Sequence, residues 1–151
     1  MSLEDLNTFI QSIEPAAEVV QGKQFPEVMV PDDRLHQLAL ELKENPSTAM
    51  DYLICLTGAD FEDHMKVIYH LESTVHNTVL VLKTKTLSRI NPVLPTVCDI
   101  WQTAEFHERE VFDLLGIRFK GHPDMRRLFL SEEWGFPLRK DYVDEVRIVD
   151  R

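Results

Sequence analysis

The segment MKVIYHLESTVHNTVLVLKT, residues 65–84, decides the fold class of this chain. Its first half places Val67, Tyr69 and Leu71 on one face, with more polar residues between them. Its second half, from Thr78, is rich in the aliphatic and β-branched residues that favour strands. A histidine–asparagine pair lies between the halves and marks a turn. The segment therefore predicts two strands that form an antiparallel hairpin.

Two amphipathic helices are expected upstream of this hairpin. The first begins at a capping box made by Ser2 and Asp5 and ends before Pro15. The second follows Pro31 and carries an apolar stripe between Leu35 and Leu42. Short strands are expected in three further upstream stretches: 17–21, 28–30 and 52–56.

Downstream of the hairpin, helical patterning runs from Thr96 to Leu115, with an interruption expected near Thr103, and Gly116 ends it. The apolar stripe of this helix includes Glu108. A buried carboxylate is costly unless it is paired, so we expect Glu108 to be buried beside a cation from the basic segment 118–140. We also expect Arg109 to pair with Glu105 or Asp113, which lie four residues away.

These elements predict an α+β fold, with a mostly antiparallel or mixed sheet and helices packed on one face, followed by an extended C-terminal arm. We expect residues 1–120 to form the α+β domain and residues 121–151 to form the arm. The net charge of −10 argues against a nucleic-acid-binding surface. The sequence contains no apolar run long enough to cross a membrane, and its N-terminus lacks the features of a secretion signal.

Two clusters of residues offer groups that could form a chemical site. Glu105, His107 and Glu110 provide metal ligands on one helix, although the HExxH motif is absent and a solvated, salt-bridged surface explains the same residues. An arginine pair, Arg126 and Arg127, resembles a phosphate clamp without a glycine-rich loop. The two cysteines cannot ligate an iron–sulfur cluster, which requires four. We expect Cys55 to be a small buried apolar residue, and we expect the six histidines to be surface or loop residues.

Two motifs resemble the signature of a known family. The first is EREVFDLLGIRFKGHPDMRRL, residues 108–128, and the second is PLRKDY, residues 137–142. Together they are similar to the C subunit, or 30-kDa subunit, of NADH:quinone oxidoreductase, which is respiratory complex I. The resemblance extends over residues 94–142, but Val143 stands where the family usually has proline and the stretch 131–136 is short. The signature and interface residues implied by the resemblance are Glu108, Arg109, Glu110, Asp113, Gly116, Gly121, His122, Pro123, Arg126, Arg127, Pro137, Leu138, Arg139, Lys140, Asp141 and Tyr142.

The resemblance implies a non-catalytic scaffold subunit in the hydrophilic arm of a proton-translocating complex. It implies that the chain binds no cofactor, with flavin and iron–sulfur clusters in partner subunits. The expected partners are chiefly the D subunit and also the B and I subunits, on the cytoplasmic side of the cell membrane. An equivalent subunit of a membrane-bound nickel–iron hydrogenase, or of another complex I-like oxidoreductase, is the alternative.

The arm carries arginine and aromatic residues together, which is the composition of interface anchors. We therefore expect residues 121–142 to dock on a neighbouring subunit. Folding back onto Glu105, Glu108 and Asp113 is compatible with docking if only part of the arm folds back. If docking is right, reversing the charges of Arg126 and Arg127 together would leave the domain folded and prevent assembly.

Overall fold

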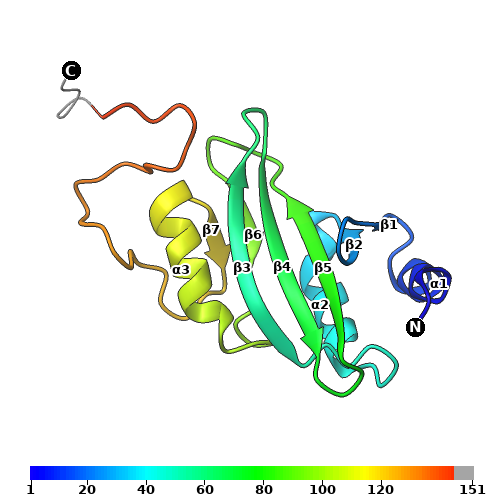
Figure 1. Ribbon diagram of the computed structural model, residues 1–151. Helices are drawn as coiled ribbons and strands as arrows, with labels where there is room; N and C mark the ends of the chain where they lie inside the picture. Colours follow the sequence, from blue (N-terminus) through cyan, green and yellow to red (C-terminus); the bar gives the residue numbers. More distant parts are fainter. Residues whose placement is uncertain (145–151) are drawn as a thin grey trace.

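A computed structural model describes residues 1–144 of the chain, which form an α+β fold with an irregular C-terminal arm (Figure 1). Residues 145–151, the last part of the expected arm, lie outside the described residues. The main sheet has five strands in the order β1-β2-β5-β4-β3. Their bounds are Glu18–Gln21 for β1, Pro26–Met29 for β2, Tyr52–Asp60 for β3, Met65–Ser73 for β4 and Thr78–Lys85 for β5.

The predicted hairpin is confirmed at the centre of this sheet. Strands β4 and β5 pair antiparallel from Lys66 opposite Lys85 to Ser73 opposite Thr78. The turn contains Asn77 at a φ of 50°, a conformation that asparagine tolerates better than most residues. Alternate β4 side chains are buried, as their period of two requires. Those buried side chains are Met65, Val67, Tyr69, Leu71 and Ser73.

The flanking strands make the sheet mixed, which is one of the two expected arrangements. Strand β3 pairs antiparallel with β4, whereas β2 pairs parallel with β5 and antiparallel with β1. Strand β3 continues to Asp60 and lies at an edge of the sheet. Only one of its faces is buried, because Ile54 is 41% exposed and Cys55 is partly exposed. The expectation that Cys55 is a fully buried residue is therefore wrong.

The three helices occupy most of the segments expected for them. Helix α1 spans Leu3–Ile13 and has the predicted capping box between Ser2 and Asp5. Helix α2 spans Leu35–Glu44 and follows a short 3-10 turn, Asp32–Arg34. Helix α3 spans Ala104–Leu115 and ends at Gly116, whose φ of 77° is left-handed.

The helix expected from Thr96 to Leu115 is wrong over residues 96–103. Residues 93–95 form a short strand, β6 (Val93–Pro95), which pairs parallel with β7 (Arg118–Lys120). Residues 96–103 are turns. Their apolar side chains enter the core from this irregular path, and the indole of Trp101 donates a hydrogen bond to the carbonyl of Met50. Burial in turns explains the helix-like pattern.

One hydrophobic core unites the inward face of the sheet with buried residues of all three helices. Helix α3 lies alongside β3, and the arm continues past α3 on the side away from the sheet (Figure 1). The close approach of α3 to β3 depends on Gly58, since a Cβ there would lie 2.5 Å from Cδ1 of Leu115. Among residues 1–144, no helix is both long and apolar enough to cross a membrane.

Candidate functional site

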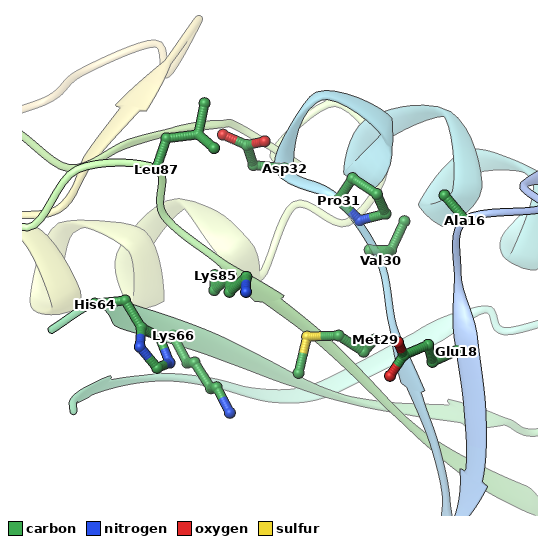
Figure 2. Close-up of a pocket in the computed structure, with 10 residues that line it drawn as sticks. All are labelled: Ala16, Glu18, Met29, Val30, Pro31, Asp32, His64, Lys66, Lys85 and Leu87. Carbon is green, nitrogen blue, oxygen red and sulfur yellow. The ribbon is translucent and has the colours of Figure 1, made fainter.

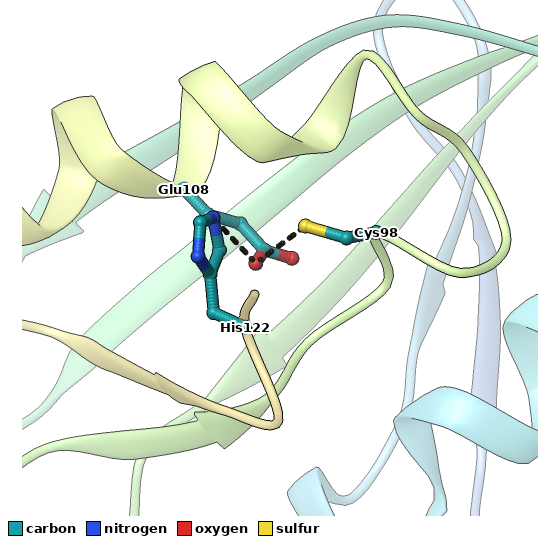
Figure 3. Close-up of side chains that lie close together, drawn as sticks. All are labelled: Cys98, Glu108 and His122. Carbon is teal, nitrogen blue, oxygen red and sulfur yellow. Dashed lines mark hydrogen bonds and ion pairs between the residues drawn. The ribbon is translucent and has the colours of Figure 1, made fainter. Parts of the chain in front are cut away.

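Glu108 lies at the centre of a buried polar cluster between α3, the turn after β6 and the start of the arm (Figure 3). Its carboxylate accepts hydrogen bonds from the Thr96 hydroxyl at 2.6 Å, the Val97 amide at 2.8 Å and the Cys98 thiol at 3.2 Å. The Nε2 atom of His122 lies 3.9 Å away. The predicted burial of Glu108 is confirmed. Its neighbour from the basic segment is this histidine, and among the described residues no arginine or lysine pairs with it.

The hydrogen bonds of His122 define its tautomer. Its Nδ1 accepts from the amide of Asp124 at 2.9 Å, so Nε2 carries the proton and donates to the carbonyl of Glu105 at 2.9 Å. His122 lies in the loop after β7, as expected of a surface or loop residue, but its side chain is fully buried. The ring ties the start of the arm to α3.

Burial sets the protonation of this cluster. Burial raises the pKa of Glu108, although the hydrogen bonds from Thr96 and Val97 oppose that shift. Burial also raises the pKa of the Cys98 thiol to about 12, and the nearby Glu108 carboxylate adds to the effect. Cys98 is therefore a protonated donor at neutral pH and a poor nucleophile.

The hydrogen bonds of this cluster do not suit a metal centre. The ligand atoms of Cys98, Glu108 and His122 all lie within 4.8 Å of one another. A metal on Nε2 of His122 would move the ring proton to Nδ1, where the amide N–H of Asp124 already points. Two donors would then face each other, so the residues fit a hydrogen-bonded cluster and not a metal site. The helix residues Glu105, His107 and Glu110 form no such convergent group within residues 1–144.

Asp113 is the second buried carboxylate of α3, and it holds the arm. One oxygen accepts from the amides of Phe129 at 2.7 Å and Leu130 at 3.1 Å. The other accepts from Arg127 at 3.2 Å. Burial alone would raise the pKa of Asp113, but these donors hold it below its ordinary value of 3.8. Arg127 also donates to the carbonyls of Trp134 and Gly135, so it gathers a loop of the arm around itself.

Arg109 does not make the expected helical pairs with Glu105 or Asp113. Its guanidinium donates to the carbonyls of Arg126 at 3.2 Å and Arg127 at 2.9 Å. The side chain of Arg126 is 68% exposed and pairs with Asp124 at 2.8 Å. The two consecutive arginines therefore point apart, and together they make no phosphate clamp.

The second motif fastens the far part of the arm. Arg139 donates to the carbonyl of Leu115 at 2.7 Å, and its guanidinium lies 5.0 Å from the centre of the Phe136 ring. The amide of Leu138 donates to the carbonyl of Leu114 at 3.0 Å. A Cβ at Gly116 would lie 2.7 Å from the Phe136 ring, so this glycine is required by space as well as by its left-handed φ.

An ion-pair network connects the end of the arm to the end of strand β3. Arg89 pairs with Asp60 at 2.6 Å and with Asp141 at 3.0 Å. Asp60 also accepts from the amide of Lys140 at 2.9 Å. Burial would raise the pKa of Asp60, but these donors lower it to about 2. Sequence analysis missed Arg89 and Asp60, because neither belongs to a motif or to a helical face that would mark it.

The remaining signature residues lie on the outer parts of the same region. Glu110 and Pro137 are half-buried, Gly121 and Pro123 are exposed, and Tyr142 is half-buried over Gly135. The roles of Thr96 and Cys98 were also missed by sequence analysis, because it assigned both residues to the helix. The structure thus brings the two motifs together along α3.

We expect Glu108 to make stability depend on pH. Because its pKa in the folded state is raised, its contribution to stability is fully present below the ordinary value of 4.5 and is lost as pH rises through the folded-state pKa. The free energy of unfolding of the wild type, minus that of Glu108→Gln, should therefore increase as pH falls from about 8 to about 5. Denaturant titrations measure it, with exposed Glu41→Gln as control. A difference that does not change with pH would contradict the assignment.

We expect Arg127→Ala to release the arm, because it leaves the fully buried Asp113 without its ion-pair partner. Breaking such a pair costs about 3–5 kcal/mol. Amide hydrogen exchange of Phe129 and Leu130 should accelerate strongly. The matched control is Arg126→Ala, at the exposed neighbouring arginine, which should leave both amides protected. Equal exchange in the two variants would show that Asp113 does not hold the arm.

Comparisons with known proteins identify the family of this chain. Residues 28–146 match the family described as the respiratory-chain NADH dehydrogenase, 30 Kd subunit. The chain is 36% identical over 143 residues to the C subunit of the NADH-quinone oxidoreductase of Moorella thermoacetica, covering 91% of this chain and 95% of that one. It is 51% identical over 117 residues to the C/D subunit of the NADH-quinone oxidoreductase of Phocaeicola vulgatus, covering 76% of this chain and 22% of that one. The chain thus spans about a fifth of the C/D relatives.

A solved structure shows the same fold. It comes from the membrane-bound sulfane sulfur reductase, an archaeal respiratory membrane complex, and one of its chains matches with a TM-score of 0.77 and 28% sequence identity. The match covers 95% of this chain and 86% of that chain. The family match spans both motifs and most of the sheet. The chain therefore belongs to the family of the 30 Kd subunit of the respiratory-chain NADH dehydrogenase.

Proposed function

We propose that this chain is the C subunit of a proton-translocating NADH:quinone oxidoreductase and acts there as a non-catalytic scaffold. The observation that carries the proposal is that polar contacts fix the arm on α3 while large apolar side chains of the arm stay exposed. Arg109, Asp113 and Arg127 hold the arm on α3 through partly buried hydrogen bonds. Three large apolar side chains of the arm remain exposed: Phe129 is 69% exposed, Trp134 45% and Leu138 59%.

An arm fixed in this way presents a preformed docking surface. Large exposed apolar and aromatic side chains on a fixed backbone are typical interface anchors, and fixing them beforehand reduces the entropy lost on binding. We define the arm surface as Phe129, Trp134 and Leu138. Domain 1–120 would then supply the platform, and residues 121–151 the docking arm.

We propose the D subunit as the main partner of the arm surface. In the relative from Phocaeicola vulgatus, the C and D units are named together as one protein, of which this chain matches 22%. Joining two units in one chain gives them a high effective concentration, which suits units that contact each other. The B and I subunits are further proposed partners, and the complex would hold the chain at the cytoplasmic side of the membrane.

The chemistry of the described residues supports a role without catalysis. Cys98 is held as a thiol, and Glu108 and His122 are engaged in hydrogen bonds within the chain. We propose that flavin and iron–sulfur clusters belong to partner subunits. The pure chain, supplied with iron, sulfide and flavin, should show no absorbance beyond that of protein. A bound chromophore in stoichiometric amount would contradict this proposal.

An equivalent subunit of a related membrane complex is the second candidate. The structural match to a membrane-bound sulfane sulfur reductase favours it, because that match covers nearly the whole chain. Nickel–iron hydrogenases of the membrane-bound type belong to the same alternative. The proteins that co-purify with the chain from its native membranes decide between the two candidates, since the electron-input subunits differ.

We expect Phe129→Asp combined with Leu138→Asp to prevent assembly without unfolding the chain. Both side chains are exposed, so the isolated chain should keep its wild-type melting temperature. Affinity purification measures how much of the chain is incorporated into the membrane complex. Both this incorporation and the activity of the complex should fall. A double reversal at Arg126 and Arg127 is a poorer test than the sequence suggested, because Arg127 holds the arm.

The matched control is Val75→Asp, at a residue that is 68% exposed in the turn between β4 and β5. This control places a charge on an exposed apolar position far along the sheet, and it should assemble normally. Normal assembly of the arm double variant, or equal failure of the control, would contradict docking through the arm surface.

A further inference from the structure

Two lysines lie side by side on the outer face of the sheet. Lys66 on β4 and Lys85 on β5 are direct partners in the antiparallel register. Their chain neighbours Met65 and Thr84 are fully buried, so both lysines project from the opposite face. Like charges directly opposite each other on paired strands are destabilising. This arrangement therefore has a cost that something must offset.

The lysine pair has no ion-pair partner within residues 1–144. Neither ammonium group has a carboxylate within ion-pair distance among the described residues, whereas Lys83, two residues before Lys85 on the same face, pairs with Glu27 at 2.5 Å. Lys66 is held in place by the Phe61 ring, whose centre lies 4.6 Å from its ammonium nitrogen. The lysine pair, Lys66 and Lys85, therefore places two ammonium groups without ion-pair partners next to each other.

The lysine pair borders a surface hollow of about 420 Å³ (Figure 2). His64 lies beside Lys66, and its buried Nε2 atom has no hydrogen-bond partner among the described residues. Leu87 overhangs the same hollow and is 90% exposed. The hollow thus brings two ammonium groups and a large apolar side chain together.

The charges around the hollow determine which kind of ligand can bind beside the lysine pair. The chain has a net charge of −10, and Glu18 and Asp32 also line the hollow. The net charge of the chain would repel an extended polyanion such as a nucleic acid. A short acidic segment meets attraction only at the lysine pair, so the charges would fix its position as well as attract it.

We propose that the lysine pair is a docking point for an acidic segment of a partner protein. A carboxylate of that segment lies between the ammonium groups of Lys66 and Lys85, and Leu87 packs against apolar side chains beside it. The inference rests on the proposed function for the partner, which is another subunit of the same complex. This contact is separate from the arm surface, because it lies on strands β4 and β5.

Carbodiimide cross-linking of the assembled complex tests the contact directly. This reagent joins an amine to a carboxylate without a spacer, so it reports only groups in contact. The complex is purified through a tag on this chain, and mass spectrometry should find Lys66 or Lys85 joined to an aspartate or glutamate of another subunit. Amine acetylation should label both lysines in the isolated chain and spare them in the complex. Full acetylation of both lysines in the intact complex would overturn the proposal.

A charge-reversal pair gives the second readout. Lys66→Glu with Lys85→Glu should lower incorporation into the complex about tenfold or more, the effect of losing charge-assisted contacts worth at least about 1.4 kcal/mol. The control, Lys23→Glu with Lys120→Glu, changes two exposed lysines and the net charge equally, and it should assemble normally. Equal behaviour of the two variants would overturn the proposal. A wild-type chain that joins no complex would instead refute the proposed function.

Discussion

A carboxylate buried in a protein must receive hydrogen-bond donors, and two carboxylates of helix α3 impose this requirement on the surrounding chain. Glu108 and Asp113 are both completely buried. Glu108 takes its donors from the turn after β6, and Asp113 takes its donors from the arm. The irregular segments on both sides of α3 are therefore fixed by the helix.

The two carboxylates differ in the donors they receive. Asp113 has an arginine and two amides, and its pKa is lowered. Glu108 has a hydroxyl, an amide and a thiol beside a neutral histidine, and burial raises its pKa. One helix thus carries a carboxylate that prefers its charge and another for which charge is unfavourable. Asp113 holds the arm through an ion pair, and Glu108 connects α3 to the turn after β6 through hydrogen bonds.

In the proposed function, the arm provides the surface on which a partner subunit docks. Because its polar groups are satisfied by α3, by Arg89 and by its own backbone, its apolar side chains can face outward without loosening the chain. The lysine pair lies on the sheet and not on the arm, so partner subunits would contact the chain at two separate places. In the proposed scaffold role, the two contacts would fix the positions of the neighbouring subunits relative to each other.

The sequence by itself determined the features that depend on local periodicity. The central hairpin follows from alternation over residues 65–84, helix α1 from its capping box, and the burial of Glu108 from its phase on the helix. The left-handed end of α3 follows from Gly116, because glycine adopts positive φ without strain. The family motifs could also be recognised in the sequence, and the family match covers them.

Only the tertiary structure decided which groups meet. Helical spacing allowed Arg109 to reach Asp113, but the carbonyls of the arm compete for it, and Arg127 takes its place. Likewise, Trp101 is placed by a hydrogen bond to the distant Met50, so the residues before α3 turn instead of coiling. The partners of a buried polar group come from segments far apart in sequence. Their identity therefore depends on the folded path of the whole chain, which no local pattern records.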